Sequence, residues 1–370
     1  MNSETVPPHS PSRIAIIGTV GVPGRYGGFE TLAENLVDWH ALHASSSDLA
    51  VYCSKRGSSL RPSRHRNAEL RWIGLDANGP QSILYDFVSL LDAVRRGDRR
   101  LLILGVSGAM ILPLVRLVPR ARIITNIDGI EWQRAKWRGI AKWVLRLSEW
   151  FAVRFSHTVV ADNQAIADYV ADRYGRDSLV IPYGGDHALL HAADNAAAAG
   201  LPDRYALALC RIEPENNVDM ILEAWRSVGS LPLVFVGNWA ASAYGRELKA
   251  RYTAVPGITL MDPVYEPAAL RAIRDRATLY VHGHSAGGTN PSLVEMMHFA
   301  IPVLAHGCSF NRHSTEGQAL YFHSASDIAA AVASLDADLS EKIGTAMAEI
   351  AGRRYRWDDI GARYFTLLQD

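Results

Sequence analysis

The sequence has few cysteines, no excess of either charge and no apolar run long enough to cross a bilayer. Its three cysteines, Cys53, Cys210 and Cys308, are too far apart for a zinc motif or a disulfide framework, which indicates a reducing compartment such as the cytoplasm. The 38 basic residues balance 38 acidic ones, so no net field would attract nucleic acid. The most apolar stretch, residues 101–115, is short and contains Gly and Pro, and it therefore predicts a strand, a turn and a helix.

The length predicts two domains, because 370 residues with 48% hydrophobic content can bury two cores. The polar, proline-rich residues 1–12 lack the apolar segment of a signal peptide and are expected to form a disordered tail. Residues 187–204 are alanine-rich and poor in strand formers, which indicates a linker. We therefore expect an N-terminal domain over residues 13–186, a C-terminal domain over 205–345 and a terminal helix over 346–370.

Short apolar runs alternate with amphipathic stretches along both halves of the chain. This alternation predicts βαβ units and, in each half, a parallel sheet with helices on both faces. The expected fold class is α/β, with two doubly wound, Rossmann-like domains. The expected strands are residues 13–19, 48–54, 101–106, 121–128 and 157–162 in the first half, and 205–212, 231–238, 257–265, 277–284 and 301–307 in the second.

A glycine-rich loop lies between the first expected strand and its helix, with Gly18, Gly21, Gly24, Gly27 and Gly28. Such a loop lets the backbone approach a ligand and presents N–H groups at a helix N-terminus, where phosphates or sugar hydroxyls bind. A dinucleotide site is disfavoured, because the spacing is G-x-x-G-x-x-G and no acidic residue ends the second strand. A turn that only packs the helix on the strand stays an alternative.

The second half places a guanidinium, an amide-rich loop and a carboxylate at strand ends. Arg211 ends one expected strand, and residues 287–292 precede a helix that carries Glu295. Ligands of open parallel sheets bind at the carboxyl ends of the strands. The forked guanidinium of Arg211 and the backbone amides of the loop suit a diphosphate, and the carboxylate of Glu295 suits the paired hydroxyls of a ribose. Alternatively, Arg211 forms a surface ion pair and Glu295 caps its helix.

Residues 14–31, 210–225 and 283–305 together resemble one enzyme family. They are similar to the two-domain GT-B glycosyltransferases of family 4, in the bacterial rhamnosyltransferase-like branch of capsule, O-antigen and exopolysaccharide assembly. The resemblance covers nearly the whole chain. It implies a nucleotide-sugar donor on the C-terminal domain, an acceptor on the N-terminal domain and transfer with retention at the anomeric carbon. The nucleotide sugar is then a substrate, and no cofactor is expected.

Two positions depart from the usual pattern of this family. Asn216 stands where most members have a Lys, so one charge that would neutralise the phosphates is missing. Arg211 then stabilises a larger share of the charge on the leaving group. Gly287 stands where the family has a Glu that meets the donor sugar, which argues for a different sugar. By resemblance alone, dTDP-L-rhamnose is the expected donor. A nucleotide-sugar epimerase of the same architecture and a non-catalytic nucleotide-binding protein stay open as alternatives.

The candidate site residues fall into three groups. Asp128 follows an expected strand where relatives carry an acceptor-side acid or His, although it could instead cap the next helix. The candidate catalytic residues are Arg211, Glu295 and Asp128; the donor-binding ones are Gly27, Gly28, Asn216, Tyr265, His284, Gly288, Thr289, Asn290, Pro291 and Ser292; the acceptor-side ones are Arg25, Tyr26, Glu30 and Glu131.

No metal site is expected. His282 and His284 lie on one face of a strand end but have no third ligand nearby in the sequence, so His284 is assigned to the donor pocket or to a packed histidine. The D-x-D pattern of residues 336–338 lies beyond the last expected strand and is interpreted as solvated surface.

Residues 131–155 are unusually basic and aromatic, with four Trp, six Arg or Lys and two Glu, a local charge of +4. A helix from about residue 139 onward would gather an apolar stripe, which either packs on the sheet or faces a membrane. With Trp132, Trp137 and the basic rim, the segment predicts peripheral binding to the inner face of the cell membrane and a lipid-linked saccharide acceptor. The stripe consists of Ile140, Trp143, Val144, Leu147, Trp150 and Phe151.

Overall fold

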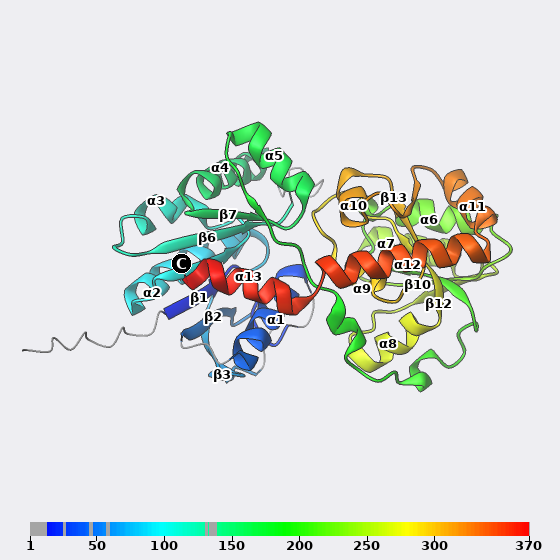
Figure 1. The fold of residues 1–370 in the computed structure, drawn as a ribbon, viewed down its shortest axis with the longest axis horizontal. Coiled ribbons are helices and arrows are strands. Elements are labelled where there is room, and N and C mark those ends of the chain that lie inside the picture. The colour runs from blue at the N-terminus through cyan, green and yellow to red at the C-terminus, as the bar shows by residue number, and fades with distance from the viewer. Residues whose placement is uncertain are drawn as a thin grey trace, which may run out of the picture.

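The computed structural model describes residues 13–24, 27–43, 47–56, 60–129, 132 and 139–369, and it places them in two α/β domains that lie side by side (Figure 1). The expected disordered tail, residues 1–12, lies outside the described residues. Each domain has one sheet with helices on both faces. The expected fold class is therefore confirmed.

The N-terminal sheet has the strand order β3-β4-β2-β1-β5-β6-β7-β8. Its neighbours pair in parallel, apart from the antiparallel pair β3 and β4 at one edge. The strands are β1 (Arg13–Ile17), β2 (Asp48–Ser54), β3 (Arg64–His65), β4 (Ala68–Ile73), β5 (Arg100–Leu104), β6 (Arg122–Ile127), β7 (Thr158–Ala161) and β8 (Leu179–Val180). The helices are α1 (Gly28–Leu42), α2 (Ser82–Arg96), α3 (Leu112–Val115), α4 (Gly139–Phe155) and α5 (Gln164–Tyr174).

The C-terminal sheet is fully parallel and has the order β11-β10-β9-β12-β13-β14. Its strands are β9 (Tyr205–Leu209), β10 (Leu233–Val236), β11 (Ile258–Met261), β12 (Ala277–His282), β13 (Val303–His306) and β14 (Leu320–Phe322). The helices are α6 (Val218–Trp225), α7 (Ala243–Tyr252), α8 (Pro267–Asp275), α9 (Pro291–Met297), α10 (Ser309–Ser314), α11 (Ala325–Ser334), α12 (Ala337–Arg354) and α13 (Trp357–Gln369).

Local signals in the sequence explain most of these elements. The apolar run of β1 is buried on both faces, as a central parallel strand requires. The side chain of Asn163 caps α5, and Gly175 ends that helix in the left-handed conformation. Each expected strand is present, though most are shorter than expected. The strands β3, β4, β8 and β14 were not expected, because they are very short or, like β4, alternate polar and apolar residues.

The chain returns to the N-terminal domain at its end, where α13 packs against α1, β5 and β6 (Figure 1). The rings of Trp39 and Phe365 stack at 5.0 Å, and the amide of Asn126 donates to the hydroxyl of Tyr364 at 2.7 Å. The single terminal helix expected over residues 346–370 is therefore wrong. That segment contains the second half of α12 and all of α13, with a break near Tyr355, so that α13 can reach the first domain.

Candidate active site

A cavity of about 700 Å³ lies between the two domains, at the carboxyl ends of both sheets. On the N-terminal side it is lined by the residues that follow β1, β5 and β6, and on the C-terminal side by those that follow β9, β10 and β12. Backbone amides and side chains at these strand ends have no further strand to occupy them, so they are available to a ligand. The architecture therefore gives both domains access to one binding site.

The structure brings together all of the expected site residues that it describes. Arg25, Tyr26 and Glu131 lie outside the described residues. The others line the cavity: Arg211, Glu295, Asp128, Gly27, Gly28, Asn216, Tyr265, His284, Gly288, Thr289, Asn290, Pro291, Ser292 and Glu30.

The glycine-rich loop serves packing and also forms part of the cavity wall. A Cβ at Gly18 would lie 2.1 Å from the carbonyl oxygen of Leu104, so the backbone of the loop needs glycine to pass β5. Glu30 turns back onto the loop and accepts hydrogen bonds from the amide of Val20 at 2.9 Å and the hydroxyl of Thr19 at 3.2 Å. The expected acceptor-side residue Glu30 thus also fixes the shape of the loop.

Arg211 presents a half-exposed guanidinium to the cavity. Its charge has one ion pair among the described residues, with Glu213 at 3.7 Å, so the surface pair considered as an alternative is present without removing Arg211 from the cavity wall. The side-chain amide of Asn216 donates to the carbonyl oxygen of Arg211 at 2.7 Å. Asn216 therefore braces the segment that carries the arginine.

Glu295 lies in the second turn of α9 and is nearly buried, so it does not cap the helix. It forms an ion pair with Arg274 of α8, and His187 approaches its other oxygen at 3.3 Å. Burial acts to raise the pKa of Glu295, but Arg274 and His187 outweigh it and lower that pKa below the ordinary value. No local pattern in the sequence singled out Arg274, which is close to Glu295 only in the folded chain.

The loop of residues 287–290, which we call the donor loop, contacts the N-terminal domain directly. The backbone amide of Thr289 donates to the carboxyl group of Asp162 at 3.1 Å, and the Thr289 hydroxyl donates to the Asp162 carbonyl oxygen. The amide of Asn163 reaches the Thr289 hydroxyl oxygen at 3.3 Å. Both residues follow β7, so their place at a carboxyl strand end was the signal that could have identified them.

Two acidic residues of the N-terminal domain meet beside the donor loop. Burial and the neighbouring charge of Asp128 raise the pKa of Asp162 well above its ordinary value. The surroundings of Asp162 therefore favour its protonated form. The alternative cap role of Asp128 falls on the segment 130–138, most of which lies outside the described residues.

Asp86 of α2 is a further carboxyl group in the cavity wall that the sequence did not single out. It is 4% exposed. Burial raises its pKa to about 8, although a hydrogen bond from the backbone of Gly108 acts in the opposite direction. Asp86 is therefore largely protonated near neutral pH and able to donate a hydrogen bond into the N-terminal half of the cavity.

The histidine pair has the expected geometry at the end of β12. The rings of His282 and His284 stack at 4.4 Å, with His282 buried and His284 at the cavity. Burial lowers the pKa of His282 to about 3, so its ring is neutral. The carboxylate pattern at residues 336–338 is exposed, and Asp336 caps α12, as expected for solvated surface.

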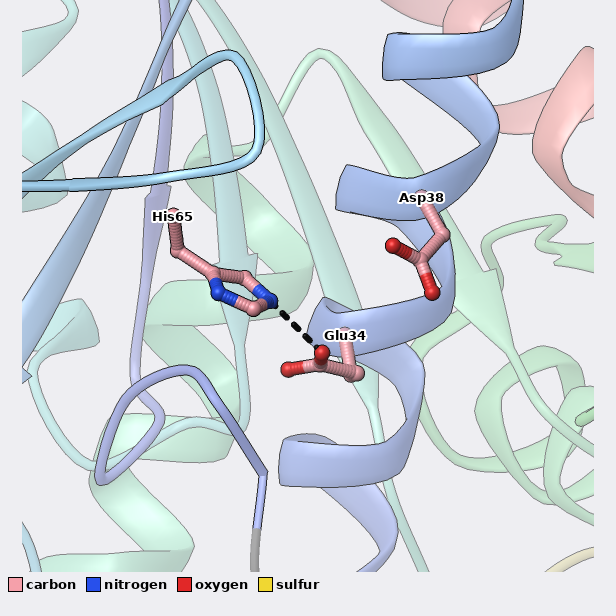
Figure 2. A group of neighbouring side chains, drawn as sticks. All are labelled: Glu34, Asp38 and His65. Carbon is pink, nitrogen blue, oxygen red and sulfur yellow. Dashed lines mark hydrogen bonds and ion pairs between the residues drawn. The ribbon is translucent and has the colours of Figure 1, made fainter.

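Within the described ranges, one cluster of possible metal ligands occurs, and it lies on α1 and β3 rather than at the cavity (Figure 2). In it, His65 contacts Glu34 at 2.7 Å. Glu34 also accepts from the amide of Gly24 at 2.8 Å, and Asp38 accepts from Arg66 at 2.9 Å. These contacts engage both oxygens of Glu34 and one oxygen of Asp38, and they attach the β3 edge to α1.

The apolar stripe of α4 does not pack on the sheet as a whole. Ile140 is 83% exposed, Trp143 65% and Trp150 43%. The buried side instead contains Glu149, whose carboxylate accepts from the hydroxyls of Tyr169 at 2.6 Å and Tyr174 at 2.5 Å. Because Glu149 faces α5 and accepts these two hydrogen bonds, much of the apolar stripe lies on the solvent-exposed side of α4.

Trp132 is not available as a free aromatic anchor. Its indole N–H lies 3.3 Å from both Glu149 and the hydroxyl of Tyr169, and Lys142, Arg146 and Arg173 surround its ring. Trp137, the other expected anchor ahead of the helix, lies outside the described residues. Within the described ranges, none of the helices has both the length and the hydrophobicity that a membrane span requires.

Both halves of the chain match known protein families. Residues 12–186 match the family described as a domain of unknown function, DUF1972, and residues 203–338 match the family described as glycosyl transferases group 1. No curated protein matches the sequence.

The fold is similar to that of solved GT-B structures. Sucrose-phosphate synthase from Thermosynechococcus elongatus superposes with a TM-score of 0.79 at 14% identity, over 97% of this chain and 98% of that one. HepE from Anabaena, solved in complex with UDP and glucose, gives 0.71 at 16% identity, over 97% and 99%. Starch synthase IV from Arabidopsis thaliana, bound to ADP and acarbose, gives 0.70 at 13% identity, over 97% and 99%. The two domains therefore have the GT-B arrangement.

Proposed function

We propose that this chain, a glycosyltransferase with the GT-B fold, transfers a sugar with retention of anomeric configuration from a nucleoside diphosphate sugar to a lipid-linked saccharide. The observation that carries the proposal is the convergence of Arg211, Glu295 and the donor loop on one interdomain cavity. A guanidinium and backbone amides suit a diphosphate, and a carboxylate suits ribose hydroxyls. The solved complexes of HepE with UDP and of starch synthase IV with ADP are consistent with a nucleotide in this fold.

The chemical step consists of one bond exchange at the anomeric carbon. The bond from this carbon to the diphosphate breaks while the acceptor oxygen bonds to the same face of the sugar, and a diphosphate oxygen takes the acceptor proton. Arg211 and the donor loop stabilise the charge that develops on the leaving diphosphate. This role needs no metal ion, and we therefore propose a metal-independent reaction.

L-Rhamnose from dTDP-L-rhamnose is the proposed donor sugar. Gly287 has no carboxylate to offer to sugar hydroxyls, and a Cβ placed there would have no described neighbour within 4 Å, which leaves open space beside the cavity. A deoxysugar makes fewer hydroxyl contacts than a hexose, so it loses less from the missing carboxylate.

The acceptor is proposed to approach from a membrane surface. Helix α3 contacts both α2 and α4, and all three expose apolar side chains on the outside of the N-terminal domain. Basic side chains accompany them, which suits anionic headgroups. The exposed apolar residues are Leu84, Phe87, Leu91, Leu114, Leu117, Ile140, Trp143 and Trp150, and the exposed basic ones are Arg95, Arg116, Arg120, Lys142, Arg146 and Arg154.

The test is transfer of labelled sugar to a polyprenyl-diphosphate-linked saccharide in detergent, with dTDP-L-rhamnose, UDP-glucose and GDP-mannose as separate donors and with EDTA present. Product formed from dTDP-L-rhamnose, with the donor's anomeric configuration by NMR, supports the proposal. Use of only the UDP or GDP sugar overturns the rhamnose assignment. A changed sugar in the absence of acceptor identifies an epimerase, and an unchanged nucleotide sugar after long incubation identifies a binding protein.

A further inference from the structure

The donor loop is held by side chains of the opposite domain. Asp162 is fully buried and accepts the amide of Thr289 at 3.1 Å, and its backbone carbonyl accepts the Thr289 hydroxyl. A Cβ at Gly288 would lie 2.0 Å from the Asp162 carboxyl group, so loop and carboxyl group are in direct contact. Two residues that are 127 positions apart in the chain therefore form one close contact between the domains.

Neighbouring groups strengthen this contact between the domains. The side-chain amide of Asn163 donates to three acceptors of the C-terminal domain: the Thr289 hydroxyl at 3.3 Å, the carbonyl oxygen of Phe310 at 3.2 Å and the hydroxyl of Ser314 at 3.1 Å. Its carbonyl oxygen caps α5 through the amide of Ala165 at 3.0 Å. The backbone of Gly129 also approaches the loop, since a Cβ there would lie 3.2 Å from the Cα of Gly287.

We propose that Asp162 and Asn163 of the N-terminal domain are positioning residues that hold the donor loop in its nucleotide-binding conformation. Thr289 lines the cavity, whereas Asp162 and Asn163 are not among the described residues that do so. These two residues therefore reach the cavity only through neighbours that line it, which are Thr289 of the loop and, for Asp162, also Asp128. The inference rests on the proposed function, because it assumes that the loop binds the nucleotide.

The surroundings of Asp162 favour the neutral form of its carboxyl group. Asp128, Tyr183 and Tyr364 face it from the ends of β6 and β8 and from α13. Burial and the charge of Asp128 raise the pKa of Asp162 well above its ordinary value, which favours the neutral form, and a carboxyl oxygen accepts from the loop. Asparagine has the same shape and can make the same contacts, whereas alanine cannot.

The experiment measures the binding of UDP and dTDP to the full chain by calorimetry, in wild type, three test variants and one control variant. Asp162→Ala is expected to bind about tenfold more weakly, equivalent to about 1.4 kcal/mol. Asp162→Asn should stay within about threefold of wild type, because the amide oxygen replaces the acceptor of the loop. Asn163→Asp keeps the α5 cap but loses the three donations into the C-terminal domain, and it should also bind more weakly.

Hydrogen exchange of the peptide over residues 285–292 gives a second measurement. Without nucleotide, Asp162→Ala should exchange faster there than wild type and Asp162→Asn should not. Thr125→Val is the matched control, because it removes the buried 2.7 Å contact between Thr125 and Ser156 in the same domain, and it should change neither nucleotide affinity nor exchange in this peptide.

The outcomes separate this inference from the proposed function. If the wild-type protein binds neither nucleotide, both fail. If wild type binds but Asp162→Ala and Asn163→Asp bind equally well, the positioning role is overturned while the proposed function stands. Equal weakening in Thr125→Val would also overturn it, because the effect would then come from the general stability of the domain.

Discussion

Arg274 and Glu295 form a buried ion pair in the wall of the interdomain cavity, with side chains 6% and 11% exposed. The two residues come from α8 and α9, so the pair joins two helices of the C-terminal domain at the expected nucleotide site. The removal of one partner leaves the other charge buried. Activity lost on substitution of Glu295 must therefore be compared with stability before it is assigned to the donor.

The first prediction concerns this pair. Arg274→Ala should lower the free energy of unfolding by about 3–5 kcal/mol, because His187 is then the one ion-pair partner of Glu295 among the described residues. Arg226→Ala is the control, since its pair with Glu223 at 3.7 Å is exposed and is worth about 0–1 kcal/mol. Urea denaturation measures both, and equal losses would contradict a special role of the buried pair.

The second prediction separates catalysis from folding. Arg211→Ala should reduce kcat about 10²–10³-fold, because the charge that stabilises the leaving diphosphate is lost. Its unfolding free energy should change by less than about 0.5 kcal/mol, because the guanidinium is half-exposed and its one described ion pair is long. Arg211→Lys should recover part of the rate through its charge but not the bidentate contact. Wild-type turnover of Arg211→Ala would remove Arg211 from the site.

The third prediction tests the packing of the donor loop. Gly288→Ala should displace the loop and weaken the binding of UDP and dTDP, because the added Cβ would lie 2.0 Å from Asp162. Gly352→Ala is the control: it lies on α12 with no described atom within 4 Å of its Cβ, and helix propensity favours alanine by about 1 kcal/mol. Calorimetry and thermal unfolding measure the two, and unchanged affinity in Gly288→Ala would count against a closely packed loop.

The fourth prediction is a pH dependence that comes from Asp86. Its folded-state pKa of about 8 exceeds the ordinary 3.8, so between these values the folded state binds a proton that the unfolded state has lost. The stabilisation is complete below pH 3.8 and is lost as the pH rises to about 8, by at most about 1.4 kcal/mol per pH unit.

Asp86→Asn should remove this dependence. The difference in unfolding free energy between wild type and Asp86→Asn should therefore shift in favour of the variant from pH 5 to pH 8, as measured by urea denaturation at both values. Other titrating groups affect both proteins alike and cancel. Parallel pH profiles of the two proteins would refute the raised pKa.

The fifth prediction concerns the membrane. Co-sedimentation with anionic vesicles should decrease in Trp143→Ala and in Lys142→Glu, since a basic residue near such a surface contributes about 1 kcal/mol and Trp favours the headgroup region. Binding should also fall with added salt and with zwitterionic lipid. Leu190→Ala is the control, because Leu190 is 78% exposed but lies in the interdomain segment. Absence of binding to anionic vesicles at low salt would contradict the membrane proposal.

The sequence by itself determined the central strands of the two sheets and the place of the candidate site. Short apolar runs predict the central strands because a strand buried on both faces needs apolar residues throughout. Once two parallel sheets are expected, Arg211, Asp128 and residues 287–292 follow strands and must lie at the same type of edge. The short edge strand β3 carries no comparable local signal.

Tertiary structure alone decided which of these residues are joined. The contacts of Asp162 with Thr289 and of Arg274 with Glu295 depend on how domains and helices dock, and no local pattern encodes that docking. The outward turn of the α4 stripe has the same origin. Periodicity shows that a helix has an apolar side, but the hydroxyls that bind Glu149 come from α5, and only the folded domain brings them there.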